Sequence, residues 1–296
     1  MKATAPTQLF DEAFLRRLEQ LELANRRLTA GRMKGERRSV RRGQSVEFAD
    51  YRTYTSGDDL RQLDWNAYAR LEKLFLKLFV EEEDVTVHVL VDASRSMDYG
   101  EPNKLDAARR AAGALGYLGL ASMDRVSVAF LGDGTASPMR PMRGKRRAAE
   151  LFAFLSEPRT ERLTGLAAAA RSYAGRMRGS GPLILISDLL DPGYLEALRD
   201  LASTRSQLSV LHLLAPDELD PRVAPDARLV DRETGQGVEV SGDDDLVERY
   251  RDRLAEWQAE IGAFVSRRGG AYVPIRSDIE LADLLFDVLR RRRVVE

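Results

Sequence analysis

Five oxygen-bearing side chains stand where predicted loops leave strands or enter helices. Asp92, Ser94 and Ser96 alternate along a segment that follows an apolar run, so all three can point the same way. Asp188 follows a second apolar run, and Thr164 precedes a predicted helix as its cap residue. Carboxylate and hydroxyl oxygens are hard ligands that suit Mg²⁺. We therefore predict a divalent metal site, with Mg²⁺ as the expected ion, whose shell an acidic side chain of a partner protein could complete.

The elements that would position these residues alternate between strands and helices. The predicted strands are Val85–Asp92, Arg125–Leu131, Pro182–Ser187, Leu208–Leu214 and Ala271–Ile275. The predicted helices are Lys104–Ser122, Lys145–Ser156, Gly165–Arg178, Gly193–Ser203, Asp244–Arg267 and Ile279–Arg292. Such alternation predicts an α/β fold, with a mostly parallel sheet and helices on both faces. Ligands of open α/β sheets lie beyond the carboxyl ends of the strands, where Asp92 and Asp188 stand.

The first 83 residues have a different pattern and are expected to form a separate N-terminal elaboration of the domain at 84–296. Its helix carries an apolar stripe at Phe10, Phe14, Leu18, Leu21 and Leu28. Apolar and aromatic residues near 46–54 and 73–80 predict strands of a small β elaboration. The alternation from Trp65 to Arg70 favours a strand, although a helix through Asp59 to Arg70 is also compatible with it. A hairpin insertion is expected near 228–241, around a Gly-rich turn.

Composition restricts the class of protein. The 296-residue chain has no cysteine and a formal net charge of -1, so disulfides and thiolate metal sites are excluded. No segment approaches the ~20 apolar residues that span a bilayer, and no apolar signal core follows Met1. We therefore expect a cytoplasmic protein without a transmembrane segment and without a general affinity for nucleic acid.

Asp92-x-Ser94-x-Ser96, together with Thr164 and Asp188, resembles the metal ion-dependent adhesion site of von Willebrand factor A domains. The resemblance implies a Rossmann-like, von Willebrand factor A-like fold in which these five residues are the metal ligands. Members usually have glycine after the last aspartate, where this chain has Leu189. That loop is therefore expected to differ, and Asp191 is a competing ligand. Arg95 replaces the glycine often found between the serines, and could meet a partner carboxylate or be solvated.

A longer segment closely resembles the bacterial family called domain of unknown function number fifty-eight. The resemblance is carried by Arg41-Arg42-Gly43, Val46-Glu47-Phe48, Tyr51-Arg52, Tyr54, Gly57-Asp58-Asp59, Arg61, Asp64-Trp65, Ala69-Arg70 and Glu81-Glu82-Glu83. Members of this family are von Willebrand factor A-like proteins, often encoded beside MoxR-type AAA+ ATPases. The resemblance implies a non-catalytic, metal-dependent protein–protein interaction module that acts with such an ATPase in protein maturation or remodelling.

Two alternatives remain open. A magnesium-dependent, phosphatase-like hydrolase could use Asp92 as phosphoryl acceptor, and Lys104 or Lys145 would then stabilise the developing charge. The basic segment from Arg26 to Arg42 could contact nucleic acid phosphates, although such runs more often pair with acids or lie on a solvated face. The two histidines lie within predicted core strands, so neither is expected to serve as general base or metal ligand.

Overall fold

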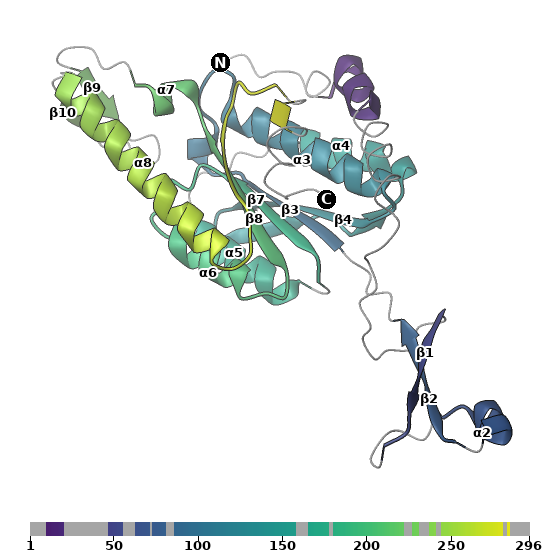
Figure 1. The fold of residues 1–296 in the computed structure, drawn as a ribbon. Helices are drawn as coiled ribbons and strands as arrows, with labels where there is room; N and C mark the ends of the chain where they lie inside the picture. Colours follow the sequence, from purple (N-terminus) through teal and green to yellow (C-terminus); the bar gives the residue numbers. More distant parts are fainter. Residues whose placement is uncertain are drawn as a thin grey trace. The chain divides into compact units, whose positions relative to one another are not determined.

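The computed structural model describes residues 10–20, 47–55, 63–71, 73–80, 86–157, 165–177, 180–221, 227–230, 237–240, 244–280 and 283–284. The chain forms two compact units, Met1–Ala24 with Val85–Glu296, and Asn25–Asp84 (Figure 1). The helix at residues 12–20 belongs to the larger unit, whereas the sequence had placed it with the N-terminal elaboration. Its position follows from burial, because Phe14 and Leu18 lie in the core of the larger unit.

A mostly parallel sheet forms the centre of the larger unit. Within the described residues it has seven strands, ordered β11-β8-β7-β3-β4-β5, with β6 also paired to β4. The parallel strands are β3 (Thr86–Asp92), β4 (Arg125–Gly132), β7 (Pro182–Ser187), β8 (Gln207–Leu214) and β11 (Tyr272–Arg276). Two short strands pair antiparallel with β4, namely β5 (Thr135–Pro138) and β6 (Met142–Arg143). The predicted α/β fold and its parallel strands are confirmed, whereas β5 and β6 were not predicted.

Helices cover both faces of this sheet (Figure 1). One face packs against α3 (Lys104–Ala121) and α4 (Ala148–Ser156), and the other against α5 (Leu166–Arg176), α6 (Tyr194–Ala202) and α8 (Asp244–Ser266). Short helical turns η3 (Arg95–Met97), η4 (Lys145–Arg147) and α7 (Pro216–Leu219) complete the connections. Because both faces are covered, β3 is buried almost throughout its length, as its continuous apolar run predicts.

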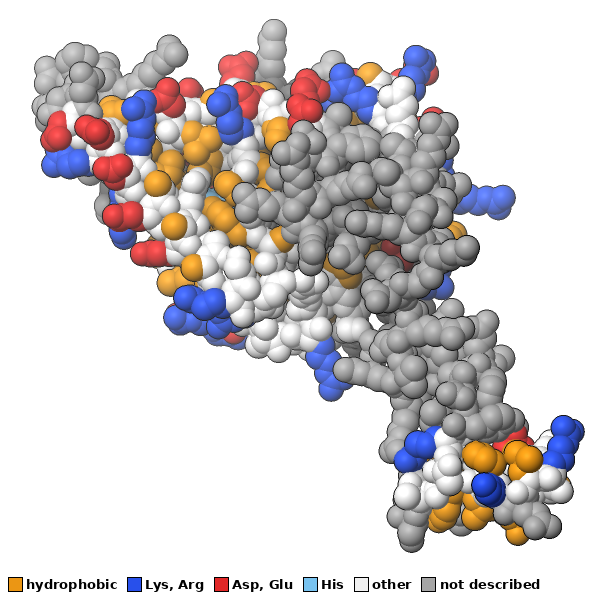
Figure 2. Space-filling model, in the orientation of Figure 1, with side chains coloured by type: hydrophobic (Ala, Val, Ile, Leu, Met, Phe, Trp, Pro, Cys, Tyr) orange, Lys and Arg blue, Asp and Glu red, His pale blue; other side chains and the backbone are white. Residues whose placement is uncertain are grey.

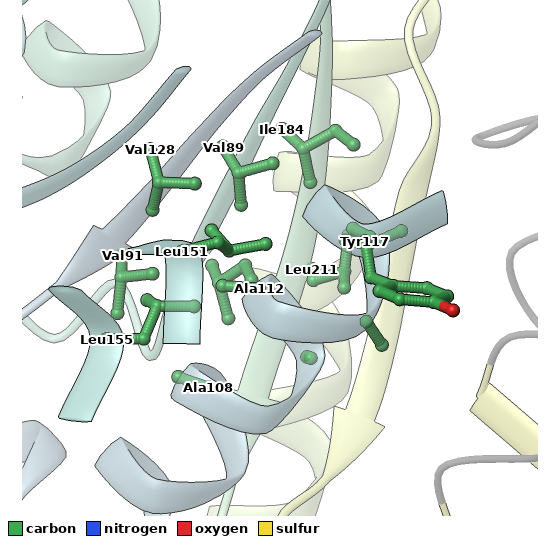
Figure 3. Close-up of a cluster of buried hydrophobic side chains, with 14 of the residues drawn as sticks. Val89, Val91, Ala108, Ala112, Tyr117, Val128, Leu151, Leu155, Ile184 and Leu211 are labelled. Atoms are coloured by element: carbon green, nitrogen blue, oxygen red, sulfur yellow. The ribbon is translucent and has the colours of Figure 1, made fainter. Parts of the chain in front are cut away.

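The core between the sheet and α3 shows how the strands and helices interlock. Figure 3 shows Val89 and Val91 of β3 pointing toward Ala108 and Ala112 of α3, with Leu151 of α4 beside them. Small alanines on α3 let the helix lie close to the sheet, and the branched side chains fill the space between them. Burial of this kind stabilises a fold by roughly 25 cal/mol for each Å² of apolar surface.

The smaller unit contains the two predicted strands, β1 (Glu47–Thr53) and β2 (Phe75–Val80), which pair antiparallel with each other. Between them, α2 (Trp65–Leu71) is helical, so the strand favoured for that segment is wrong. The Asp64 Oδ1 atom accepts hydrogen bonds from the backbone amides of Asn66 and Ala67 at 2.9 and 3.1 Å, as a helix N-cap does. Because the cap fixes the first turn, the Trp-Ala alternation does not decide the conformation.

The predicted hairpin insertion is confirmed as β9 (Ala227–Val230) paired antiparallel with β10 (Gly237–Val240). Three other interpretations fall outside the described residues: the loop carrying Thr164, the Arg26–Arg42 segment and most of the helix expected from Ile279. No helix among the described residues is long and apolar enough to cross a membrane. Along α8, both acidic and basic side chains lie on the surface (Figure 2), and the six acidic residues of the helix outnumber its three arginines.

Candidate metal centre

The strand order places the ends of β3 and β7 at a switch point of the sheet. After β3 the chain enters α3 on one face, and after β7 it enters α6 on the opposite face. Because β3 and β7 are neighbours, their connections diverge at the carboxyl edge, where ligands of such sheets bind. Asp92 ends β3 and Asp188 directly follows β7, so the structure brings these two predicted ligands to the same edge of neighbouring strands.

The loop after β3 presents the first three predicted ligands together. The backbone amide of Ser94 donates to Asp92 Oδ1 at 2.9 Å, which folds the loop back on its own carboxylate. The Ser94 and Ser96 hydroxyl oxygens lie 3.0 Å apart. All three side chains are buried, whereas Arg95 between the serines is exposed. The loop therefore gathers three oxygens inside while it presents one cation to solvent.

Asp92 is also bound by the neighbouring strand. The Ser187 hydroxyl donates to Asp92 Oδ2 at 2.5 Å and accepts a hydrogen bond from the Leu189 amide at 2.9 Å. Burial, with a smaller contribution from the charge of Asp188, raises the pKa of Asp92 to about 7. Sequence analysis had overlooked Ser187, although its position as the last residue of β7 was the available signal.

Leu189 adopts backbone geometry that suits glycine. Its φ is 55°, in the left-handed region, while its side chain is only 1% exposed. A side chain in that region costs roughly 1–2 kcal/mol, which packing of the leucine offsets. The backbone at Leu189 therefore has the positive φ that glycine adopts readily. This chain differs from the resembled pattern in the side chain at that position.

A lysine lies at the centre of the acidic side chains. Lys104, the first residue of α3, is fully buried, and its Nζ atom donates to Asp188 Oδ2 at 2.7 Å and Glu218 Oε1 at 2.6 Å. The other carboxylate oxygen of Glu218 accepts from the Ala215 amide at 2.7 Å. Burial raises the pKa of Glu218, while Lys104 opposes that rise. The sequence suggested Lys104 only for a hydrolase, and its pairing with Asp188 and Glu218 was missed.

His212 of β8 forms a hydrogen bond with the backbone of the Asp188 loop. Its Nε2 atom lies 2.9 Å from the Asp188 carbonyl oxygen, and its Nδ1 atom lies 2.6 Å from the Tyr272 hydroxyl. Because the carbonyl can only accept, Nε2 carries the proton. Burial lowers the pKa of His212 to about 4, so the ring is neutral near pH 7. This histidine positions backbone and presents no free nitrogen to a metal.

Asp191, considered as a competing ligand, is bound by backbone amides. Its Oδ1 atom accepts from Gly193 at 2.5 Å and its Oδ2 atom accepts from Leu166 at 3.0 Å. The second bond ties the start of α5 to the loop that carries Asp188. Gly165 also lies against the backbone of Gly134, where a Cβ would stand 2.6 Å from the Gly134 nitrogen. These contacts fix the chain immediately after Thr164, which itself is outside the described residues.

The donor set fits a small hard cation at the Asp92 loop. Two neighbouring ligands of an octahedral Mg²⁺ shell at about 2.1 Å stand roughly 3 Å apart, as the two serine hydroxyls do. Among the described residues, His, Asp and Glu alone form no group of three able to hold a metal, so a metal at this edge would need hydroxyl ligands as well. Asp188 uses its Oδ2 atom to accept the hydrogen bond from Lys104. Among the hydrogen bonds of the described residues, its Oδ1 atom accepts only that of the Leu190 amide, at 3.2 Å, so Oδ1 is the oxygen better placed to serve as a metal ligand.

Residues 50–260 match the sequence model of a family described as "Protein of unknown function DUF58". The chain belongs to the DUF58 family. The match includes the Asp92 and Asp188 loops, Lys104 and Glu218, so the whole carboxyl-edge cluster lies within the family's region.

Mycobacterial proteins are similar to this DUF58 chain along most of its length. The uncharacterized protein Rv1480 of Mycobacterium tuberculosis and the uncharacterized protein Mb1516 of Mycobacterium bovis are each 27% identical over 284 residues. The alignments cover 93% of this chain and 89% of each relative.

Two solved structures from Bacteroides are similar in part. An aerotolerance-related membrane protein from Bacteroides fragilis has 17% identity and a TM-score of 0.47, covering 71% of this DUF58 chain and 100% of the other. The conserved hypothetical protein BatB from Bacteroides thetaiotaomicron has 20% identity and a TM-score of 0.42, covering 65% and 90%. At these scores neither likeness bears on what the protein does.

Proposed function

We propose that this DUF58 protein is a non-catalytic, metal-dependent protein–protein interaction module with a von Willebrand factor A-like site. The observation that supports it is the convergence of Asp92, Ser94, Ser96 and Asp188 at the carboxyl edge of the sheet. Asp92 and the two hydroxyls would hold Mg²⁺, with Asp188 and Thr164 completing the protein's share. The ion would supply an open coordination position for a carboxylate of the partner.

The charges of the cluster suit a divalent ion. The carboxylates of Asp92, Asp188 and Glu218 and the ammonium of Lys104 together leave two formal negative charges. One Mg²⁺ would balance them and keep the buried cluster neutral, which favours binding because uncompensated buried charge is costly. Exposed Arg95, beside the two serines, would add a second contact for an incoming carboxylate.

The proposed partner is a MoxR-type AAA+ ATPase, and the proposed process is protein maturation or remodelling in the cytoplasm. Such an ATPase needs Mg²⁺ for its own nucleotide, so chelation would disturb both proteins and cannot test the site. Binding of the purified ATPase to the parent and to the Ser94→Ala, Ser96→Ala double variant at constant Mg²⁺ separates the two effects. Equal binding by both forms would contradict the role of the cluster.

Metal binding itself is tested by thermal unfolding. Mg²⁺ should raise the Tm of the parent, because a ligand that binds only the folded state stabilises it, by about 2.7 kcal/mol at 100 times its Kd. The Ser94→Ala, Ser96→Ala variant should lose that shift and keep its fold. The matched control replaces two exposed serines, Ser122→Ala and Ser203→Ala, and should respond as the parent does.

A phosphatase-like hydrolase is the second candidate, because Lys104 lies beside Asp188 at the same edge as Asp92. The geometry of the site favours the hydrolase less than it favours the interaction module. Lys104 is buried between two carboxylates rather than directed at a substrate. Release of phosphate from p-nitrophenyl phosphate with Mg²⁺, lost in Asp92→Asn, would establish the hydrolase instead.

A further inference from the structure

A second concave site lies at the opposite end of the strands from Asp92. It is a pocket of ≈440 Å³ whose lining includes Thr86 and Arg125, the first residues of β3 and β4. The end of α5 contributes Tyr173 and Arg176, and the chain around β5 contributes the apolar Ala136. Its volume is within the range of pockets that enclose small organic molecules, which is about 300–1,000 Å³.

A row of buried polar groups stands in this pocket's lining. His88 Nδ1 lies 2.8 Å from the Tyr173 hydroxyl, which lies 3.4 Å from the Ser127 hydroxyl. Ser127 in turn donates to the Met139 carbonyl at 3.4 Å. The short contact between His88 and Tyr173 engages the Nδ1 atom in either tautomer of the ring, whichever of the two groups donates.

The other ring nitrogen of His88 has no such contact. His88 is only 4% exposed, and its Nε2 atom has no hydrogen-bond partner among the described residues. Burial lowers the pKa of His88 to about 4, so the ring is neutral near pH 7. An unpaired buried polar atom is costly, and a ligand hydroxyl, which can both donate and accept a hydrogen bond, would relieve that cost.

The charged side chains that line the pocket are all positive. They are Arg125, Arg140 and Arg176, and no carboxylate occurs among the described residues that line the pocket. The three arginines are exposed, so they lie toward the solvent side of a lining that is otherwise mostly apolar. Arginine binds carboxylates through a planar fork of donors, which suits an organic acid.

We propose that this pocket binds a small organic acid with an apolar body, whose carboxylate meets the arginines and whose hydroxyl group meets His88. The apolar lining encloses the body of the molecule, the unpaired Nε2 atom selects a hydroxyl, and Arg140 and Arg176 select the negative charge. The proposal is independent of the metal centre, because it uses other residues at the other edge of the sheet.

The test uses 4-hydroxyphenylacetate, which combines a ring, a donor and a carboxylate. Phenylacetate lacks the donor, and 4-hydroxyphenethyl alcohol lacks the carboxylate. Binding is followed by the side-chain ¹⁵N resonances of the two histidines in the full chain. The His88 resonance should move on addition of 4-hydroxyphenylacetate, while that of His212, whose nitrogens both have partners, should stay. Each truncated probe should bind roughly tenfold more weakly, as loss of one charge-assisted or buried hydrogen bond implies.

Variants locate the interaction. Arg140→Gln with Arg176→Gln should weaken the two acids and leave 4-hydroxyphenethyl alcohol unchanged. Ala136→Trp should abolish binding of every probe, because it fills the pocket. No movement of the His88 resonance at roughly 10 mM 4-hydroxyphenylacetate, ten times a millimolar Kd, would overturn the proposal. So would equal binding of all three probes, or unchanged binding to Ala136→Trp.

Discussion

The buried polar groups at the two ends of the parallel sheet differ in how completely they are paired. At the carboxyl edge, Lys104 forms ion pairs with both Asp188 and Glu218, and both nitrogens of His212 have partners. At the amino edge, His88 has one partnered nitrogen and one orphan, and the nearby charged groups are arginines. The two histidines are alike in burial and in lowered pKa. They differ in their hydrogen-bond partners, so the partners of a buried group, rather than its residue type, indicate which ligand its site would accept.

The largest expected effect removes the charge that holds the carboxyl edge together. Lys104→Met should lower the free energy of unfolding by about 3–5 kcal/mol, because it leaves the buried Asp188 and the partly buried Glu218 without a counter-ion. Urea unfolding in metal-free buffer measures it. The exposed pair of Arg276 and Asp278 is the control, and Arg276→Ala should cost less than about 1 kcal/mol. A Lys104→Met protein as stable as the parent would show that the carboxyl edge does not depend on this ammonium.

The second effect concerns acidification at the amino edge. Because the pKa of His88 is lowered to about 4 in the folded protein, the unfolded state binds a proton first as pH falls below about 6.5. The contribution of the neutral ring is therefore complete above pH 6.5 and is lost as pH falls to about 4, by up to roughly 3 kcal/mol.

His88→Phe isolates this contribution. The difference in unfolding free energy between the parent and the variant should change with pH between about 6.5 and 4, and should be constant above 7. Urea titrations at several pH values measure it. If the difference is the same at every pH, His88 titrates normally and its likeness to His212 in lowered pKa fails.

The smallest effect concerns the strained turn at the carboxyl edge. Leu189→Gly should be more stable than Leu189→Ala by about 1 kcal/mol, because only glycine accepts a φ of 55° without strain. Both should be less stable than the parent, which buries the leucine. At Leu185, buried in β7 within the same core, the order should reverse, with alanine the more stable. If alanine is more stable than glycine at both positions, the turn stores no strain.

Much of the fold followed from local pattern. The apolar runs of β3, β4, β7, β8 and β11 were recognised because a strand covered on both faces needs apolar residues at nearly every position. The segment Trp65–Leu71 was misassigned because alternation over seven residues cannot separate helix from strand, while the cap at Asp64 gave the better signal. The short strands β5 and β6 carry too few residues to show a period.

The sequence by itself determined which residues end the strands, and so which oxygens reach the carboxyl edge. Only the tertiary structure decided how those oxygens are paired. Lys104 is 84 residues from Asp188 and 114 from Glu218, and the pairing depends on β7 lying beside β3. Strand order is set by packing of the whole sheet, so no local pattern contains it. The same holds at the amino edge, where His88 and Tyr173 meet across 85 residues and leave one nitrogen without a partner among the described residues.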